Sequence, residues 1–499
     1  MKIYKDILKS ILVALVVFTT SCTSDFEDIN TDKDKPTTST SGTLLPSVIF
    51  EPLNAHIDVQ LFLTNHIMQY WVWRNDNHQI DEYDFASGKG KFDVLWSKIY
   101  RALIDSNESI AYAEANNLDA YVAAGKIMNA FYIATLTEMW IDVPFSEASK
   151  GLDNSQPAYD KQELIYPQVL ALLKEANTLL ANDTEGFVLD GDVLFGGDVM
   201  KWRRMANSLR LRYLLRLSNQ SSVNAESEIN TIVSDPTTYP IITSNSEAAI
   251  YDFSGVAPNT SGFSQISATR IDGLSPSQRF VSTLDGVDST DDADDDPRLA
   301  FFAEKPIAVP TTGPYLFLGV KNGTTREEAQ GTGGNAEINA SFFTNKFQDN
   351  PGLLDFTFIG YSEVQFILAE ARLNNWITAG TAQQYYENGI TANLDYWDIT
   401  TPAGFLSRED VAWDNTLDTL INQKWIALFF NNTIATWGDY KRLGLPAYDI
   451  GPLATTVTSG KVPTRVFYPT LEQSVNSANY SAAASSIGGD IITAPHWYQ

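Results

Sequence analysis

Residues 361–371 read Tyr-Ser-Glu-Val-Gln-Phe-Ile-Leu-Ala-Glu-Ala, and their pattern indicates the fold class. Its apolar residues recur three and four positions apart, which places them on one face of an α-helix. The same spacing recurs in three other stretches of the chain. The positions that share such faces are Leu95, Ile99, Leu103 and Ile110; Ile165, Val169, Leu172, Leu173, Ala176 and Leu180; Val364, Ile367, Leu368 and Ala371; and Leu417, Leu420, Ile421, Trp425 and Leu428. The chain is therefore predicted to be mainly α.

Amphipathic helices joined by short polar turns are typical of helix-hairpin repeats, and we expect a tetratricopeptide-like scaffold with a period of about 34 residues. Alternation typical of strands is brief, at residues 250–253 and 315–320. Ser275 and Pro276 are predicted to cap and open a further helix, because proline is favoured at the first helical position.

Two stretches lack the helical period. Residues 235–353 are rich in Gly, Thr, Asn and Pro, and residues 444–499 are similar. Long irregular segments inside a compact protein usually carry function rather than merely connect helices. These two segments are expected to form a ligand surface on the helical scaffold.

The N-terminus has the pattern of a secretory signal. Lysines precede an apolar run at 11–18, and three small residues then lead to Cys22, the only cysteine in the chain. The run is too short to span a bilayer, which takes about 20 residues. We therefore predict that residues 1–21 are a cleaved signal peptide and that Cys22 is the lipidated N-terminus, rather than a buried or stray thiol.

The chain after Cys22 divides into two parts. Residues 22–43 are acidic, then rich in Thr, Ser and Asp, and show no apolar period, which is typical of a flexible tether. Residues 44–499 are expected to fold as a single domain.

Charge argues against nucleic acid as a partner. The formal net charge is -27, and removal of residues 1–21, which carry +2, leaves about -29. Such a field repels nucleic acid. Six cations between Lys201 and Arg216 resemble a nucleic-acid stripe, but pairing with neighbouring carboxylates is the better account in so acidic a chain.

Familiar catalytic motifs are absent from the sequence. Only four histidines occur, and the chain contains no His-Glu-x-x-His pair, no phosphate-binding loop and no Gly-x-Ser-x-Gly turn. His66 is expected to be a surface or core histidine rather than a ligand. The acidic run from Asp285 to Asp296 superficially suits calcium, but it lacks the EF-hand order, and a solvated loop is the preferred reading. We expect a binding protein without a cofactor.

The predicted ligand site follows the first helix, where Met68-Gln-Tyr-Trp-Val-Trp-Arg-Asn-Asp-Asn-His78 passes from aromatic to polar residues. Rings there could stack on a sugar, while neighbouring polar groups bond its hydroxyls or the backbone of a peptide. A core role is at least as plausible for Tyr70 and Trp71. The favoured residues are Trp73, Arg74 and Asn75, and the weaker candidates for an opposite wall are Tyr83, Tyr315 and Phe317.

Ordered blocks along the chain resemble the SusD/RagB family of outer-membrane nutrient-binding lipoproteins, particularly its SusD-like branch. They are Leu136-Thr-Glu-Met-Trp-Ile-Asp-Val-Pro-Phe-Ser-Glu-Ala148; Trp202 through Ala-Asn-Ser-Leu209 to Arg212; Asp296-Pro-Arg-Leu299; residues 361–371; Gln423-Lys-Trp425 with Trp437-Gly-Asp-Tyr-Lys-Arg442; and Arg465-Val-Phe-Tyr-Pro469. Ile141 stands where the family usually has Gly. These motifs are expected to cap helices, pack cores and pair charges rather than to bind ligand.

The resemblance implies a function. Four tetratricopeptide-like helix pairs would dock on a SusC-like TonB-dependent transporter, and the protein would close over that barrel as a lid. The ligand would be an oligosaccharide, or alternatively an oligopeptide, while a surface glycoside hydrolase is a further alternative. Acidic residues after Cys22 look like the signal that exports such lipoproteins to the cell surface: Asp25, Glu27 and Asp28.

Overall fold

The computed structural model describes residues 39–74, 78–85, 89–182, 189–265, 273–286, 294–304, 317–330, 341–342 and 354–499. Residues 41–499 form one compact unit, distinct from residues 1–40. The first helix of this unit, α3 (Ser41–Phe50), starts close to the predicted start of the folded domain at residue 44.

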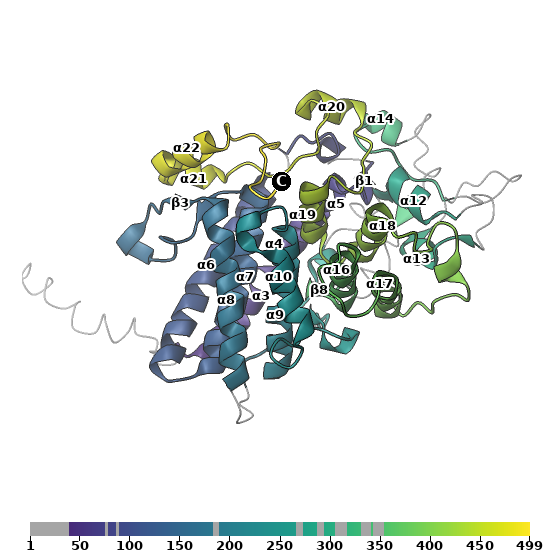
Figure 1. Cartoon of the computed structure of the whole chain (residues 1–499). Helices are drawn as coiled ribbons and strands as arrows, with labels where there is room; N and C mark the ends of the chain where they lie inside the picture. The colour runs from purple at the N-terminus through teal and green to yellow at the C-terminus, as the bar shows by residue number, and fades with distance from the viewer. Residues whose placement is uncertain are drawn as a thin grey trace, which may run out of the picture. The chain divides into compact units, whose positions relative to one another are not determined.

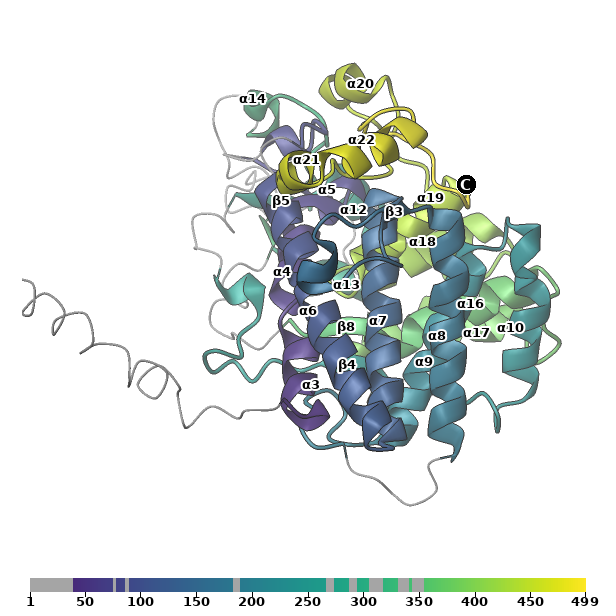
Figure 2. The same ribbon diagram turned by 90° about the vertical axis from the view of Figure 1, so that its left-hand side faces the viewer.

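Four helix pairs build the scaffold (Figure 1). Each pair consists of consecutive antiparallel neighbours that contact each other, and α7 and α8 also pack together in Figure 2. The pairs are α6 (Lys89–Ala115) with α7 (Asp119–Trp140), α8 (Gln162–Asn182) with α9 (Val199–Arg216), α16 (Tyr361–Leu373) with α17 (Ala382–Tyr396), and α18 (Leu417–Leu428) with α19 (Thr433–Leu443). The predicted mainly α, tetratricopeptide-like scaffold is confirmed.

The apolar faces named in the sequence are the packed faces. On α6, Leu95 and Ile99 are fully buried, and on α8 so are Val169 and Leu173. Helix α7 is buried along almost its whole length, because α3, α6, α8, α9 and α19 surround it. A helix in the middle of a layer has no solvent side, so its sequence shows little amphipathicity.

Sheet is confined, in the described residues, to four antiparallel two-stranded pairs. They are β1 (Trp71–Trp73) with β5 (Leu274–Pro276), β2 (Val143–Pro144) with β3 (Tyr159–Asp160), β4 (Ala249–Tyr251) with β8 (Phe356–Ile359), and β6 (Ala303–Glu304) with β7 (Ser341–Phe342). Strand β4 overlaps the alternation predicted at 250–253. Residues 317–320 form no strand beyond one bridge at Val320, and 315–316 lie outside the described residues.

Both segments predicted to be irregular contain short helices. These are α12 (Gln278–Leu284), α13 (Pro297–Phe302), α14 (Arg326–Ala329), α20 (Pro452–Thr458), α21 (Thr470–Val475) and α22 (Ser477–Ser486). The prediction that Ser275 caps a helix is wrong by two residues. Ser275 and Pro276 belong to β5, and the side chain of Ser277 accepts the hydrogen bond from Phe280 N that caps α12.

The remaining elements connect these parts. They are α4 (Leu53–Val59), the π-helical turn η1 (Gln60–Thr64), α5 (Asn65–Ile67) and α10 (Ala225–Ser234), with 3-10 turns η2 (His78–Ile80), η3 (Gly151–Asn154), η4 (Ser221–Val223), η5 (Asn245–Glu247), η6 (Gly262–Gln265) and η9 (Phe405–Ser407).

The cationic helix α9 pairs internally, as predicted. Four of its arginines contact carboxylates on four other segments of the chain, and three of these four arginine side chains are buried. The pairs are Arg204 with Glu247 at 3.2 Å, Arg210 with Glu228 at 3.0 Å, Arg212 with Glu363 at 2.6 Å and Arg216 with Glu138 at 3.2 Å. These arginines therefore link the helix layers rather than face a nucleic acid.

Ile141 has a positive φ in the turn that ends α7. Its φ is +74°, a conformation that a β-branched residue rarely adopts. Thr137 holds the turn, since its carbonyl accepts from Ile141 N at 3.0 Å and its hydroxyl donates to Ile141 O. The turn for which the resemblance expects Gly thus forms with Ile.

Candidate functional site

The aromatic residues predicted to floor a ligand site lie in the core. Tyr70 and Trp73 have no exposed surface, and Trp71 is 1% exposed. Tyr70 stacks on Trp425 with ring centroids 4.6 Å apart, and its hydroxyl donates to Trp425 O at 2.6 Å. Tyr70 and Trp71 thus have the core role that their sequence made at least as plausible as ligand binding.

Trp73 corrects the prediction most directly. Its indole stacks between Phe62 and His66, at 5.9 and 5.8 Å between centroids. The residue lies in β1, whose pairing with β5 turns the expected loop into a covered strand. A ring without exposed surface offers no face to a sugar. The prediction that Trp73 forms an exposed floor for a ligand is therefore wrong.

The other predicted site residues divide into two groups. Arg74, Tyr83 and Phe317 are at least nine-tenths buried, and Arg74 N donates to Gly273 O at 2.8 Å. They form no open opposite wall. Asn75, Tyr315 and the lipidation site Cys22 lie outside the described residues, as do residues 287–293 of the acidic run.

A polar hollow lies beside this strand. It has a volume of about 140 Å³, and its walls come from the end of the first helical stretch, from both segments predicted to carry ligand surface, and from no other part of the described chain. Its lining residues are Gln69, Gln278, Arg279, Ser282, Lys321, Asn322 and Asp449. We refer to these residues as the polar hollow.

Backbone hydrogen bonds bring the walls together. Ser277 N donates to Tyr70 O at 3.0 Å, and Gln278 N donates to Val320 O at 2.7 Å. The third wall approaches so closely that a Cβ on Gly451 would lie 2.2 Å from Asn322 O. Segments distant from one another in the sequence therefore meet in close contact at the polar hollow.

The buried strand anchors the floor of the polar hollow. Asn322 Nδ2 donates to Trp71 O and to Asp81 Oδ1, both at 3.1 Å. Asp81 also accepts from Trp73 N at 2.9 Å and contacts His66 Nδ1 at 2.9 Å. His66 is thus a buried core histidine, one of the two roles expected of it.

Arg279 supplies a fixed cation. Its guanidinium lies 5.2 Å from the rings of both Trp425 and Tyr448 and donates to Ala447 O at 2.6 Å. Burial lowers the pKa of Arg279 from its ordinary value, but a guanidinium remains charged. The ring contacts and the hydrogen bond hold this charge in place before any ligand arrives.

The rim of the polar hollow is open to solvent. Gln278, Ser282, Lys321 and Asp449 have exposed side chains, so amide, hydroxyl, ammonium and carboxylate groups all face one small concavity. Sites that recognise polar ligands converge such groups on a concave surface. The hollow is smaller than the roughly 300–1,000 Å³ of enclosed sites, and it suits one unit of a longer ligand.

The sequence carried only a weak signal for these residues. Gln69 falls within the quoted stretch that was expected to bind, but its side chain was not singled out. Arg279 follows the Ser-Pro-Ser-Gln sequence, which by itself predicts only the start of a helix. Lys321, Asn322 and Asp449 lie in segments whose composition indicates a surface but not which residues meet.

The fold is that of a helical-repeat protein with an open polar hollow on its surface. A family model described as SusD-like, starch-binding and associating with the outer membrane matches residues 33–469. The chain therefore belongs to the SusD-like family, as the sequence motifs indicated. This is a family of binding proteins rather than enzymes.

Solved structures share the fold. A chitin-binding protein matches with a TM-score of 0.77 and 24% identity over 92% of this chain and 99% of its own. A SusD homologue from Bacteroides fragilis matches with a TM-score of 0.77 and 21% identity over 92% and 100%. A chitin-binding SusD homologue from Flavobacterium johnsoniae gives 0.72 and 20% over 92% and 98%.

No curated protein sequence matches the chain. Among the helices that the structure describes, none combines the length and the apolar character needed to cross a membrane. Across the same residues, no cluster of three or more His, Cys, Asp or Glu side chains is arranged to hold a metal ion.

Proposed function

We propose that this protein binds oligosaccharides in the polar hollow, at the surface of a bacterial outer membrane. The observation that carries the proposal is the convergence of Arg279, Lys321 and Asp449 with neutral amides in one open concavity. Hydroxyl groups of a sugar both donate and accept, so a mixed set of donors and acceptors suits them. The family description and the chitin-binding neighbours support a carbohydrate ligand.

The sugar would then pass to a membrane transporter. A SusC-like TonB-dependent barrel is the partner implied by family resemblance, and the lipid on Cys22 would keep the protein beside it. Pulldown of the native lipoprotein in mild detergent tests this step. Recovery of an outer-membrane barrel supports delivery, and recovery of none counts against it.

An oligopeptide is the alternative ligand. Arg279 and Asp449 carry opposite charges, as the two ends of a short peptide do. Calorimetric titration with neutral oligosaccharides and, separately, with oligopeptides distinguishes the two ligand classes. A heat of binding for the sugars that is lost when residues of the polar hollow are substituted supports the proposal. A heat of binding for peptides and none for sugars overturns it.

A further inference from the structure

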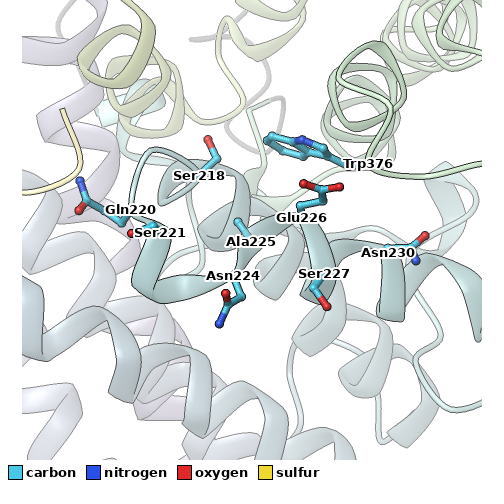
Figure 3. A pocket seen from close by; sticks show the side chains of 9 residues that line it. All are labelled: Ser218, Gln220, Ser221, Asn224, Ala225, Glu226, Ser227, Asn230 and Trp376. Atoms are coloured by element: carbon cyan, nitrogen blue, oxygen red, sulfur yellow. The ribbon is translucent and has the colours of Figure 1, made fainter.

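A second hollow, larger than the polar hollow, lies on the helical scaffold. Figure 3 shows its lining side chains, and its volume is about 580 Å³. It lies where α9 ends, between η4, α10 and the turn after α16. We call it the scaffold hollow. The lining residues that bear on ligand binding are Gln220, Asn224, Glu226, Ser227, Asn230 and Trp376. It shares no residue with the polar hollow.

The chemistry of the scaffold hollow is that of an aromatic platform among neutral polar groups. Trp376 is half-buried, with part of its indole packed against the main core and the remainder lining the hollow. In Figure 3 its ring lies on the same side of the hollow as the carboxylate of Glu226. A half-exposed indole fixed by packing stacks on a flat apolar face at low entropic cost.

The polar side chains around this ring are available. Among the described residues, the side chains of Asn224, Ser227 and Asn230 make no hydrogen bond within the chain, and Glu226 has no ion-pair partner. Gln220 is held in place, because its Nε2 donates to Trp497 O at 2.8 Å. The hollow therefore offers amide, hydroxyl and carboxylate groups to a ligand.

The charge of the lining selects the ligand class. No lysine or arginine lines the scaffold hollow among residues that the structure describes, and Glu226 is its only ionic group. With a net charge of -27 for the whole chain, an anionic ligand is disfavoured. A carboxylate accepts hydrogen bonds from hydroxyl groups, and the face of a sugar ring stacks on indole.

The backbone holds these groups in fixed positions. Asn224 joins η4 to α10 in the left-handed conformation, with φ of +51°. Asn375, with φ of +61°, ends the turn before Trp376, whose N–H donates to Ala371 O at 2.9 Å. Both sides of the hollow thus rest on helix ends rather than on long loops.

We infer that the scaffold hollow is a second carbohydrate-binding site, which takes a neutral hexopyranose unit stacked on Trp376 with its hydroxyl groups bonded to Glu226. This inference concerns a separate surface, so it stands or fails independently of the polar hollow. Two sites on one protein would hold a long glycan more firmly than either site alone.

Fluorine NMR of the 5-fluorotryptophan-labelled chain tests the site directly. The chain has 11 tryptophans, and the resonance lost in Trp376→Tyr identifies Trp376. The probes are maltoheptaose, chitohexaose, cellohexaose and mannohexaose, added to millimolar concentration. We expect at least one of them to shift this resonance, while trigalacturonate, an anionic sugar, shifts it less.

A test variant and a matched control variant complete the experiment. Glu226→Ala should weaken the Kd reported by the Trp376 resonance by about tenfold, the loss expected for one charged hydrogen-bonding group. Glu108→Ala, which removes an exposed carboxylate on α6, should leave that Kd unchanged. Failure of all four neutral probes to shift the resonance, or equal losses in Glu226→Ala and Glu108→Ala, overturns the inference. If the polar hollow does not bind sugar, the Trp376 resonance still shifts, because it reports on the scaffold hollow alone.

Discussion

Arg212 donates two hydrogen bonds to Glu363, with Nε and Nη2 each 2.6 Å from a carboxylate oxygen. Both side chains are buried, and they join α9 to α16 across 151 residues of sequence. Arg212 is the last residue of the family motif that begins at Trp202, and Glu363 belongs to the motif at residues 361–371. This agrees with the expectation that these motifs hold the scaffold rather than the ligand.

Glu363→Ala should lower the free energy of unfolding by about 3–5 kcal/mol, because it leaves the Arg212 charge buried without its carboxylate. Denaturant unfolding measures the change. Glu175→Ala is the matched control, since Glu175 pairs with Lys126 at 2.9 Å on the surface and should cost less than about 1 kcal/mol. Equal losses in the two variants would show that the buried pair contributes no more than a surface pair.

Trp73→Ala should destabilise the fold by about 3–5 kcal/mol, because it empties a core position between Phe62 and His66. Chemical denaturation gives this value, and titration with sugars shows whether any remaining folded protein still binds. A stable variant that has lost sugar binding would contradict the core assignment and restore the prediction made from sequence.

Asp355 provides a test by pH. Burial, and then the neighbouring Asp252, raise the pKa of Asp355 to about 7. The folded state therefore holds a proton that the unfolded state releases near pH 4, and stability falls between about pH 4 and pH 7. Asp355→Asn removes this dependence.

The Asn variant should match the wild type at pH 4 and exceed it at pH 8 by roughly 1–3 kcal/mol, a value reduced for partial exposure of the carboxyl. Thermal unfolding across this range measures the difference. Parallel pH profiles of the two proteins would contradict the raised pKa.

The helices could be predicted because their apolar faces are local signals. The spacing of Val364, Ile367, Leu368 and Ala371 places them on one face, and all four are buried in α16. Helix α7 is buried along almost its whole length and has no such stripe, so apolar spacing alone does not reveal it. Ser277 was missed as a cap because β5 takes Ser275 and Pro276 into a strand, and that pairing depends on residues about 200 positions away.

The candidate site was much less predictable. Aromatic rings that end an apolar stretch suit a ligand floor and a core equally well, and what covers Trp73 is decided by its distant partner strand. The polar hollow was hard to predict for a different reason, because its residues do not stand out in the sequence. Gln69, Arg279, Asn322 and Asp449 are unremarkable in sequence and acquire a shared role only when four segments meet.

Cys22→Ala should release the protein from the membrane in soluble form. The prediction rests on the position of Cys22 after a short apolar run and three small residues. Metabolic labelling with a fatty-acid probe measures acylation, and the wild type alone should carry label. Equal labelling of the wild type and Cys22→Ala would contradict the proposed anchor.

Calorimetric titration of the purified chain with maltoheptaose, chitohexaose, cellohexaose and mannohexaose tests whether the polar hollow binds sugar. The double variant Gln278→Ala with Lys321→Ala removes two exposed side chains of the polar hollow, whereas Lys174→Ala removes an exposed lysine on α8. We predict that the double variant weakens the Kd for the bound sugar at least about tenfold, the effect of losing key contacts, while Lys174→Ala binds as the wild type does. An unchanged Kd in the double variant, or no binding of any of these sugars by the wild type, would contradict the account.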